Sequence, residues 1–495
     1  METTKKFECI CGYDNNGTVV DAGDGILRKI NKRYFGKTKE IFEFYENFRR
    51  NCGDIVETEL IEDQESLYHK KHLTTYPFEW PPNMFKDALI FHLELFLKSD
   101  AAGYTLKDGL PNNILFNGTI PVFIDFLSFL KTEDLKNEKW LAENSEYNDL
   151  RYEVFEKMFI PYFIIPFLVI AKGNYDAGRF MLREKACNMP NGIPSWDDIA
   201  FLKTEGTIKK LIKKITGKPT DTEINKDIRA IYQFLRQEKK LSFPEFISKM
   251  IAMVRDIDVT PKSSGYLSYY NDKKENFNIS DRTGWKNKQI NVYNTIQKCK
   301  PKTVLDLGAN TGWFSLLAES SGASVISIEI DESCVDNLYK YAKQERLNIT
   351  PLRVAFEEME NKYFGLDYDK NEYPEYKDRD FKNNPLFISA SKRLKSDMVM
   401  CLALFHHLVL GMGMDQEHVM EVLSELTSDV LILEFIGIDD LLITSEPSFF
   451  KNLHKYDSKS YNPDRVVNIG MQFFKNVEIL DSHPNTRKLI VFHKQ

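Results

Sequence analysis

The chain has 495 residues, more than one ordinary hydrophobic core accommodates, so we expect two or three domains. Its hydrophobic content of 42% and charged content of 28% are those of a globular protein, and a net charge of −7 argues against a general nucleic-acid or anionic-membrane surface. Seven scattered cysteines form no C-x-x-C pair, and no apolar leader opens the sequence. These features predict a cytoplasmic protein with reduced thiols.

Residues 1–130 contain two acids and an amide at a spacing typical of phosphoryl transfer. Asp108 and Asn113 lie in one run, and Asp125 follows the next apolar stretch. The run is similar to the catalytic loop and metal-binding strand of protein-kinase-like and aminoglycoside-phosphotransferase-like folds. In those folds the first Asp positions the acceptor hydroxyl, the Asn holds a metal, and the second Asp bridges the metal to phosphates. The similarity implies an α+β kinase-like N-terminal domain.

Two departures leave the activity of this domain open. Leu106 stands where these folds have a histidine, and no glycine-rich loop precedes it at a convincing spacing; Gly17–Gly25 is a weak candidate. Arg28 or Lys29 is a weak candidate for contact with phosphates, and Tyr76–Trp80 would lie at the hinge between two lobes. The domain is therefore either a kinase that uses ATP and Mg²⁺ or a degenerate one.

The middle of the chain is predicted to be mostly helical. Helices of the first domain are expected to continue to about residue 205, followed by a helical connector over 206–282. The most apolar segment, Met158–Ala171, is too short to span a bilayer and contains two prolines, so it predicts a buried helix broken by proline. Tyr269 and Tyr270 precede the next domain and are expected either to contact cofactor or substrate, or to pack in the core.

Strand and helix patterns alternate over residues 283–495, as in an α/β fold with a parallel sheet. Near-continuous apolar runs such as 398–404 and 430–433 are typical of strands buried on both faces. The polar stretch 357–395 lacks periodicity and is predicted to be an insertion, a candidate lid. The expected elements are helix 283–298, strand 303–307, helix 312–321, strand 324–329, helix 331–346, strand 349–354, strand 397–404, helix 415–427, strand 429–436 and β-rich segments at 466–480 and 487–493.

A glycine-containing turn joins the first two of these strands through a helix. Strand 303–307 runs into Gly308-x-x-x-Gly312, and the next strand ends on Glu329. Glycines let backbone N–H groups and a helix N-terminus face a ligand, and the acid can accept hydrogen bonds from a ribose diol. A dinucleotide fingerprint would need glycine where Asn310 stands, and a phosphate-binding loop would need lysine after Gly312. The sequence therefore predicts a site for another adenosine-bearing cofactor.

This D-x-G-x-x-x-G pattern with a following acid resembles class I S-adenosylmethionine (SAM) methyltransferases, which implies a Rossmann-like seven-stranded fold. The resemblance implies that Asp306 faces the methionyl ammonium and that Glu329 binds the ribose. Class I enzymes have an acid just after the third strand; this chain has Arg353, so either Glu357 takes that role or backbone and apolar contacts hold adenine. The expected cofactor-binding residues are Asp306, Gly308, Ala309, Asn310, Gly312, Glu329, Ile330, Glu357 and Leu404.

Two histidines follow the fourth strand, at the edge where ligands of open α/β sheets bind. His406 or His407 can remove the acceptor's proton as the methyl group arrives, unless both only pack or face solvent. His406 is placed ahead of His407 because this position faces the cleft in similar enzymes. Glu434, on the last parallel strand, either contacts substrate or is a buried structural carboxylate. No third ligand accompanies the histidines at helical spacing, so no metal is expected in this domain.

The whole chain resembles a bacterial family in which a kinase-like region is fused to a class I methyltransferase, with members described as nodulation or polysaccharide-related proteins. The resemblance implies methyl transfer to an acceptor. We expect a hydroxyl of a sugar, glycan precursor or specialised metabolite, and a thiol or an amine stays open as an alternative. A bifunctional kinase–methyltransferase and a non-catalytic SAM-binding scaffold are the alternatives. We expect neither a nucleic-acid partner nor a membrane span. The matching landmarks are Tyr76–Trp80, Leu106–Asn113, Pro121–Phe129, Val304–Ser315, Leu402–Leu408 and Leu431–Phe435.

Overall fold

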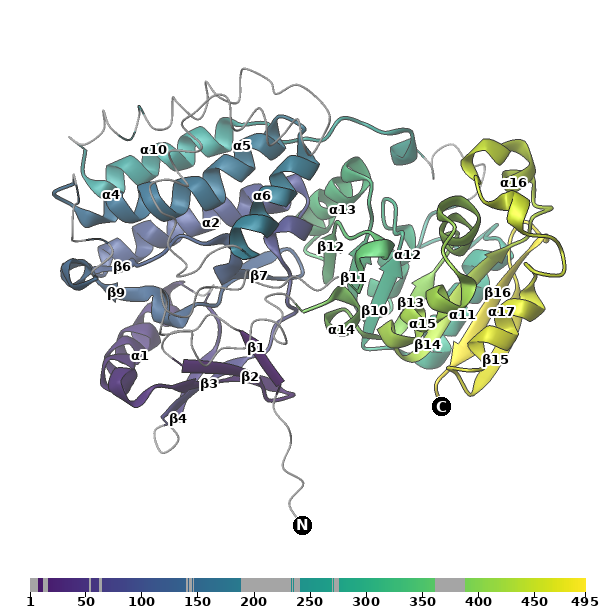
Figure 1. The fold of residues 1–495 in the computed structure, drawn as a ribbon, viewed down its shortest axis with the longest axis horizontal. Helices are drawn as coiled ribbons and strands as arrows, with labels where there is room; N and C mark the ends of the chain where they lie inside the picture. The colour runs from purple at the N-terminus through teal and green to yellow at the C-terminus, as the bar shows by residue number, and fades with distance from the viewer. Residues whose placement is uncertain are drawn as a thin grey trace, which may run out of the picture. The chain divides into compact units, whose positions relative to one another are not determined.

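The computed structural model divides the chain into two compact units (Figure 1). Unit 1 comprises Met1–Thr260 and Lys362–Ile388, and unit 2 comprises Pro261–Asn361 and Ser389–Gln495. The structure describes all residues except 1–7, 12–16, 53–54, 62–64, 139–140, 142–144, 146, 188–232, 234, 236–240, 269, 271–275 and 361–387.

Unit 1 begins with a five-stranded antiparallel sheet in the order β1-β2-β3-β5-β4. The helix α1 connects β3 to β4 and buries Ile41, Tyr45 and Phe48, whose spacing places them on one helical face. Tyr45 packs edge-on against Phe126, which ties this helix to the rest of the unit. The elements are β1 (Glu8–Cys11), β2 (Gly17–Asp21), β3 (Gly25–Ile30), α1 (Lys32–Cys52), β4 (Thr58–Ile61) and β5 (Ser66–Lys70).

The remainder of unit 1 is mainly helical and contains two small antiparallel pairs, β6 with β9 and β7 with β8. Its core is strongly aromatic: Trp80, Phe85 and Phe116 are completely buried, and Trp80 packs against both phenylalanines. The elements are α2 (Pro82–Ala101), β6 (Tyr104–Leu106), β7 (Ile114–Asn117), β8 (Ile120–Phe123), β9 (Phe129–Lys131), α4 (Leu150–Val154), α5 (Ile165–Ala171), α6 (Tyr175–Cys187) and α10 (Phe243–Asp256).

The most apolar helical stretch, Leu150–Ala171, lies inside unit 1. It passes from α4 through a π-helical segment, Phe155–Ile164, into α5 without a break. The wider π turn accommodates Pro161, which cannot donate a backbone hydrogen bond. Among the described residues it is the one stretch long and apolar enough to cross a membrane, but 89% of its most apolar window is buried. The expected buried helix is therefore confirmed, whereas the expected break is wrong.

Unit 2 is built on a seven-stranded sheet in the order β12-β11-β10-β13-β14-β16-β15. The first five strands in this order are parallel, and β16 is antiparallel to both β14 and β15. The strands are β10 (Thr303–Leu307), β11 (Ser324–Ile328), β12 (Ile349–Leu352), β13 (Ser396–Cys401), β14 (Thr427–Ile436), β15 (Asn476–Asp481) and β16 (Arg487–His493). The helices are α11 (Asn287–Cys299), α12 (Trp313–Glu319), α13 (Glu332–Glu345), α14 (Ala390–Arg393), α15 (Gln416–Leu426), α16 (Leu441–Ser445) and α17 (Pro463–Gly470).

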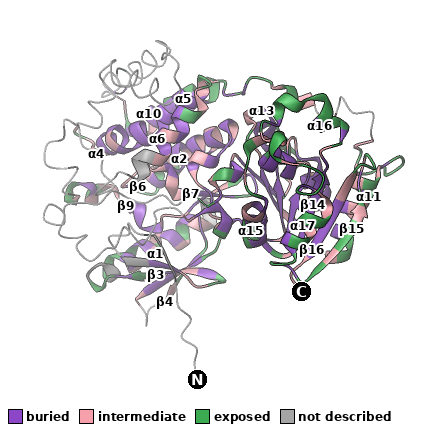
Figure 2. Cartoon of the chain, turned by 45° about the vertical axis from the view of Figure 1, so that its right-hand side comes forward, coloured by how far each residue is buried: buried purple, intermediate pink, exposed green. Residues whose placement is uncertain are grey.

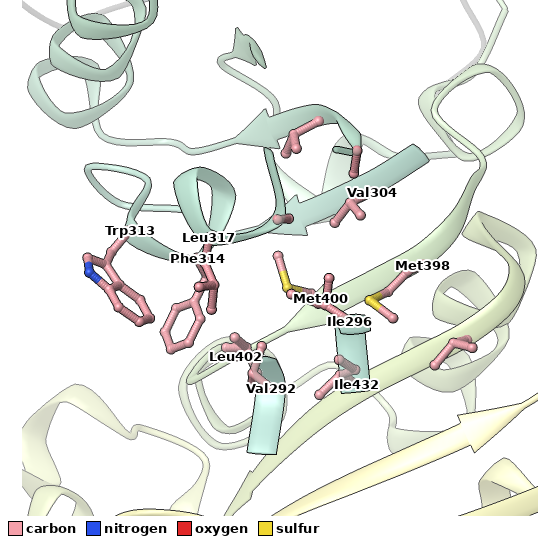
Figure 3. Packing of buried hydrophobic residues seen from close by; sticks show 14 of the residues in the cluster. Val292, Ile296, Val304, Trp313, Phe314, Leu317, Met398, Met400, Leu402 and Ile432 are labelled. Carbon is pink, nitrogen blue, oxygen red and sulfur yellow. The ribbon is translucent and has the colours of Figure 1, made fainter. Parts of the chain in front are cut away.

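Both faces of the central strands are covered, so these strands are largely buried (Figure 2). One face packs against α11, α12 and α13 in a single hydrophobic cluster (Figure 3). Figure 3 shows Phe314 and Leu317 of α12 beside Val292 of α11 and Leu402, which follows β13. On β13, Met398 and Met400 enter this cluster, whereas α15 and α17 contact β13, β14 and β16. The α/β architecture expected from the continuous apolar runs is present.

Three sequence predictions for this region need correction. The units divide after Thr260, whereas we expected the last domain to begin at 283, because Phe277 and Ile279 pack on the core of unit 2. The connector is not helical throughout: α10 ends at Asp256, and among the described residues between it and α11 the one helical element is a short 3-10 turn, Gly265–Ser268. The segment 466–480 is partly α17 and not wholly β. Most of the candidate lid 357–395 lies outside the described residues.

Candidate functional site

The turn between β10 and α12 has a backbone that side chains rarely adopt. Gly308 has φ +69°, Asn310 φ +54° and Gly312 φ +86°. A Cβ added at Gly312 would lie 2.5 Å from the Cδ1 atom of Leu338, so both conformation and packing require glycine there. A Cβ at Gly308 would lie 3.6 Å from Leu404, which places this predicted residue directly beside the turn. Gly312 therefore packs against α13, and Gly308 lies beside Leu404 at the carboxyl edge of the sheet.

Glu329 follows β11 and is held against this turn. Its Oε2 accepts a hydrogen bond from the Asn310 N–H at 2.8 Å, and its Oε1 accepts from the N–H groups of Ile330 at 2.7 Å and Asp331 at 3.0 Å. Burial raises the pKa of Glu329, although these backbone donors oppose the rise. The N–H groups of Gly308 and Ala309 both bond the carbonyl of Ile328. The structure thus brings together the residues that the sequence assigned to ribose and methionyl binding.

Asp306 lies beneath the turn, with 2% of the residue exposed. Its Oδ2 accepts a hydrogen bond from the Ser315 hydroxyl at 2.6 Å, and Ser315 in turn accepts one from Ser327 at 2.8 Å. Burial raises the pKa of Asp306 to about 6, against the lowering effect of Ser315. The carboxylate therefore anchors the first turn of α12 to the sheet. The contact with a methionyl ammonium stays a prediction.

Apolar side chains lie on either side of the turn. Ile330 is 58% exposed directly after Glu329, which suits a flat apolar ligand such as adenine. Ala403, just before Leu404, has φ +53°, a strained conformation for alanine. Glu357 is exposed on a 3-10 turn after β12. The Arg353 that replaces the usual acid pairs with Glu332 at 3.8 Å and Glu358 at 3.5 Å.

The segment before α11 also reaches the turn. The Asn310 side chain donates through Nδ2 to the carbonyl of Tyr266 at 3.1 Å, and the Ser264 N–H donates to Ser333 Oγ at 3.2 Å. The predicted contact residue Tyr269 lies outside the described residues. Tyr270 instead packs edge-on against Phe277, next to the core. Of the two readings for Tyr270, core packing is the one that its contacts support.

The two histidines differ in exposure, and their order of preference must be reversed. His406 is completely buried, and neither ring nitrogen has a hydrogen-bond partner, because Phe450 and His407 pack against the ring. Burial first, and then His407, lowers the pKa of His406 well below its usual value. His407 is exposed and stacks on Phe450, and partial desolvation lowers its pKa as well. His407, and not His406, is therefore accessible to an acceptor in this conformation.

Glu434 is a buried structural carboxylate, which contradicts the substrate-contact reading. It is completely buried, and its oxygens accept from the Lys288 ammonium at 2.6 Å and the Ser482 hydroxyl at 2.7 Å. Burial favours a raised pKa, but Lys288 and Ser482 more than offset this, so the pKa of Glu434 is lowered. Sequence reasoning missed Lys288 because a lysine near a helix start ordinarily faces water. It also missed the pair of Arg487 with buried Asp440, whose pKa is about 2.

Unit 1 brings its three predicted phosphoryl-transfer residues together. The Asn113 amide donates through Nδ2 to Asp108 Oδ1 at 2.6 Å and to Asp125 Oδ2 at 3.5 Å. Arg28 of β3, a weak candidate in the sequence, reaches Asp125 at 3.3 Å, whereas Lys29 is exposed. Burial and the neighbouring Asp125 raise the pKa of Asp108 to about 7. Over the described part of the chain, no group of three or more His, Cys, Asp or Glu side chains is arranged to hold a metal.

Comparisons with known proteins found a relative by sequence and several similar solved structures, although no protein-family model matches the sequence. The chain is 25% identical over 382 residues to the nodulation protein NoeA of Rhizobium meliloti (strain 1021), covering 74% of this chain and 69% of that protein. The resemblance to nodulation-type proteins expected from the sequence is confirmed in this respect.

Similar solved structures include the bifunctional kinase–methyltransferase WbdD, with 16% identity, a TM-score of 0.29, and coverage of 46% of each chain. Another is the magnesium protoporphyrin IX methyltransferase of Synechocystis PCC 6803 with bound SAM, with 16% identity, a TM-score of 0.24, and coverage of 42% of this chain and 79% of that one. The chain spans about half of WbdD.

Proposed function

We propose that unit 2 binds SAM and transfers its methyl group to a hydroxyl of a sugar, glycan precursor or specialised metabolite. The observation that carries this proposal is the contact of Glu329 with the Asn310 N–H, between two glycines of positive φ. It places an acid suited to a ribose diol beside a glycine turn at the carboxyl edge of the sheet, where open α/β sheets bind ligands. The free cysteines Cys299, Cys334 and Cys401 suit the reducing cytoplasm, where we place the protein.

The residues present fit SAM. A Cβ at Gly308 would meet no atom closer than 3.6 Å, Glu329 lies at the next strand end, and exposed Ile330 follows it, whereas Gly312 lets the turn pack against Leu338. Bound SAM supplies a methyl group on a cationic sulfur. The chain's task is to align the acceptor oxygen with that methyl group, since positioning accounts for much of such catalysis. Leu404 beside Gly308 limits where the acceptor can lie.

His407 is the residue that we propose as general base. Its lowered pKa keeps the imidazole neutral near pH 7, so a ring nitrogen can accept the proton that the acceptor hydroxyl loses. His406 packs beside it, with the ring centroids 4.1 Å apart, and holds the ring in place. His406 is thus a positioning residue in this proposal, and His407 a catalytic one.

SAM binding by the whole chain, measured calorimetrically, tests the cofactor assignment. Glu329→Ala removes the acid and is expected to weaken SAM binding at least about tenfold, the loss of one charge-assisted hydrogen bond to the ribose. Glu319→Ala, on α12 of the same unit, is the control and should bind normally. Equal SAM affinity in wild type and Glu329→Ala would show that this acid does not hold the cofactor.

The role of His407 is tested by turnover once an acceptor is found. His407→Gln is expected to lower kcat about 10²–10⁴-fold with little change in SAM affinity, as for loss of a general base. His418→Gln, a half-buried histidine on α15, is the control. An unchanged kcat in His407→Gln would show that another group removes the proton from the acceptor.

A second candidate function is favoured by the convergence of Asp108, Asn113 and Asp125 in unit 1. We propose that this site binds ATP with Mg²⁺ and transfers phosphate, so that the protein is bifunctional. Asp125 and the Asn113 amide oxygen would hold the metal, and Asp108 would orient the acceptor hydroxyl. A thermal shift with Mg-ATP that disappears in Asp125→Ala would support it; no shift in the wild type would contradict it.

A further inference from the structure

His407 lacks the polar partner that usually orients a general base. In most sites of this kind a third group, such as a carboxylate, hydrogen-bonds the base and holds its ring in one orientation. Among the described residues, no side chain hydrogen-bonds the imidazole of His407, and its ring lies against two other rings, those of His406 and Phe450. The orientation of this imidazole therefore depends on the packing of rings.

The three rings contact one another pairwise. The ring centroid of Phe450 lies 5.5 Å from that of His407, with the ring planes inclined by 29°, and 5.7 Å from that of His406. The two imidazole centroids are 4.1 Å apart. Phe450 is only 3% exposed, whereas Phe449, the residue before it, is 64% exposed. Two buried rings thus pack against the exposed ring of His407.

Hydrogen bonds between two connections of the sheet hold Phe450 beside His407. His407 begins a π-helical segment that follows β13, and Phe450 lies in the connection that follows β14. Asn452 donates its N–H to the carbonyl of Leu410 and its Nδ2 to the carbonyl of Gly411, both at 2.9 Å. Both carbonyls belong to the π-helical segment. Phe450 therefore cannot move away from His407 without loss of these bonds.

The other end of the same connection is fixed to β16. The carboxylate of Asp440, which is completely buried at the start of α16, accepts hydrogen bonds from the Leu442 N–H at 2.9 Å and the Thr486 hydroxyl at 2.6 Å. It also accepts two from the guanidinium of Arg487, both at 3.0 Å. The connection is thus bonded at both ends, and Phe450 lies between them.

We propose that Phe450 is a positioning residue for His407 and that its ring takes the place that a carboxylate has beside other general bases. This rests on the proposed function above, in which His407 removes the acceptor's proton. Phe450 fixes the plane of the imidazole, so that a ring nitrogen is directed at the acceptor oxygen as the methyl group arrives. A stacked hydrocarbon ring adds no charge, so it orients the base without stabilising the protonated form.

The contact with Phe450 also affects the protonation of His407. Burial, and not a nearby charge, lowers the pKa of His407, whereas the charges of Arg487, Asp440 and Lys288 act on the neighbouring histidine. Removal of the Phe450 ring lets water reach the imidazole, so the pKa of His407 should rise toward its ordinary value of about 6.5. A Phe450 that supported the fold without orienting His407 would leave this pKa unchanged.

The experiment follows the imidazole itself, by NMR titration of the whole chain with ring-labelled histidine, and His407→Gln identifies the signal. Phe450→Ala is expected to raise the pKa of His407, and Phe450→Tyr, which keeps the ring, should match wild type. Phe449→Ala is the matched control, because it removes the exposed neighbouring ring, and it should leave the pKa unchanged. Phe450→Leu serves if Phe450→Ala does not fold, and should raise the pKa by less.

Turnover with an acceptor then tests the positioning. Phe450→Ala should lower kcat about ten- to a hundredfold at unchanged SAM affinity, and the acid limb of its pH profile should move to higher pH with the pKa of His407. A His407 pKa unchanged in both Phe450→Ala and Phe450→Leu would overturn the inference, whether or not the protein transfers methyl groups. A raised pKa together with an unchanged kcat in His407→Gln would instead overturn the proposed base, and with it this part of the proposed function.

Discussion

An ion pair lies beside each candidate site, and the two pairs differ in kind. Lys288 and Glu434 of unit 2 are 2.6 Å apart, with the carboxylate fully buried and its second oxygen bonded to Ser482. Arg28 and Asp125 of unit 1 are 3.3 Å apart, and each side chain is partly exposed. The first pair is complete and has no place for a ligand. The second is longer and partly exposed to water, so we expect it to contribute less to stability than the first.

The largest expected effect comes from breaking the buried pair. Lys288→Met leaves the Glu434 carboxylate buried without its cation, which is expected to lower the free energy of unfolding by about 3–5 kcal/mol. Lys298→Met is the control, because Lys298 lies on the same helix in an exposed pair with Glu478, worth about 0–1 kcal/mol. Urea unfolding measures both. An equal decrease in the free energy of unfolding of the two variants would show that Lys288 contributes no more than an exposed lysine.

The glycine turn of unit 2 should be nearly as sensitive. Gly312→Ala forces alanine to φ +86° and places its Cβ 2.5 Å from Leu338, so we expect a loss of about 2–3 kcal/mol in stability and weaker SAM binding. Gly322→Ala separates conformation from packing, since Gly322 has φ +93° but no atom within 4 Å of the added Cβ. It should cost about 1–2 kcal/mol and leave SAM affinity unchanged. A normal SAM affinity in Gly312→Ala would contradict a cofactor role for the turn.

Protonation distinguishes the acids of the two sites. The pKa of Asp108 is raised to about 7, so the folded state holds its proton more tightly than the unfolded state, and stability falls as pH rises from about 4 to about 7. Asp306 changes stability in the same direction, but because its pKa is about 6, its contribution stops falling at a lower pH than that of Asp108. Each contributes at most about 1.4 kcal/mol per pH unit. Asp108→Asn should flatten the urea-unfolding profile up to pH 7; a profile unchanged from wild type would show that Asp108 has an ordinary pKa.

The smallest expected loss of stability comes from breaking the ion pair of unit 1. Arg28→Met breaks the loose pair, and because Asp125 keeps the Asn113 contact and some exposure to water, we expect a loss of only about 1 kcal/mol. Thermal unfolding of the whole chain, measured for Arg28→Met and for Lys288→Met in parallel, compares the two losses of stability. A loss as large as that of Lys288→Met would make the Arg28 pair structural and remove the distinction between the two pairs.

The sequence predicted best what depends on neighbouring residues. Strand 303–307 has the predicted limits, and the turn after it has the positive φ values that glycines at 308 and 312 indicate. The contact between this turn and Glu329 was also predictable, because the adjacent parallel strands β10 and β11 end at the same edge of the sheet. These features follow from local periodicity and from glycine conformation.

What the sequence did not predict depends on contacts between distant segments. Lys288 and Glu434 are 146 positions apart, and Arg28 and Asp125 are 97 apart, so no local pattern pairs them. The burial of His406 similarly depends on Phe450, which follows β14. Side-chain exposure at the end of a strand is decided by what packs over it, and a single sequence does not contain that information in any nearby residue.

The division of the chain also limits how it can be dissected. Residues 362–388 lie between two strands of unit 2 yet belong to unit 1, where the Ile388 N–H donates to the Tyr76 hydroxyl at 2.8 Å. A fragment that stops at Thr260 therefore lacks a segment of its own unit, and one that starts at Pro261 carries a segment assigned to the other unit. The two proposed activities are best separated by point substitution in the intact polypeptide, because no single proteolytic cut releases either half whole.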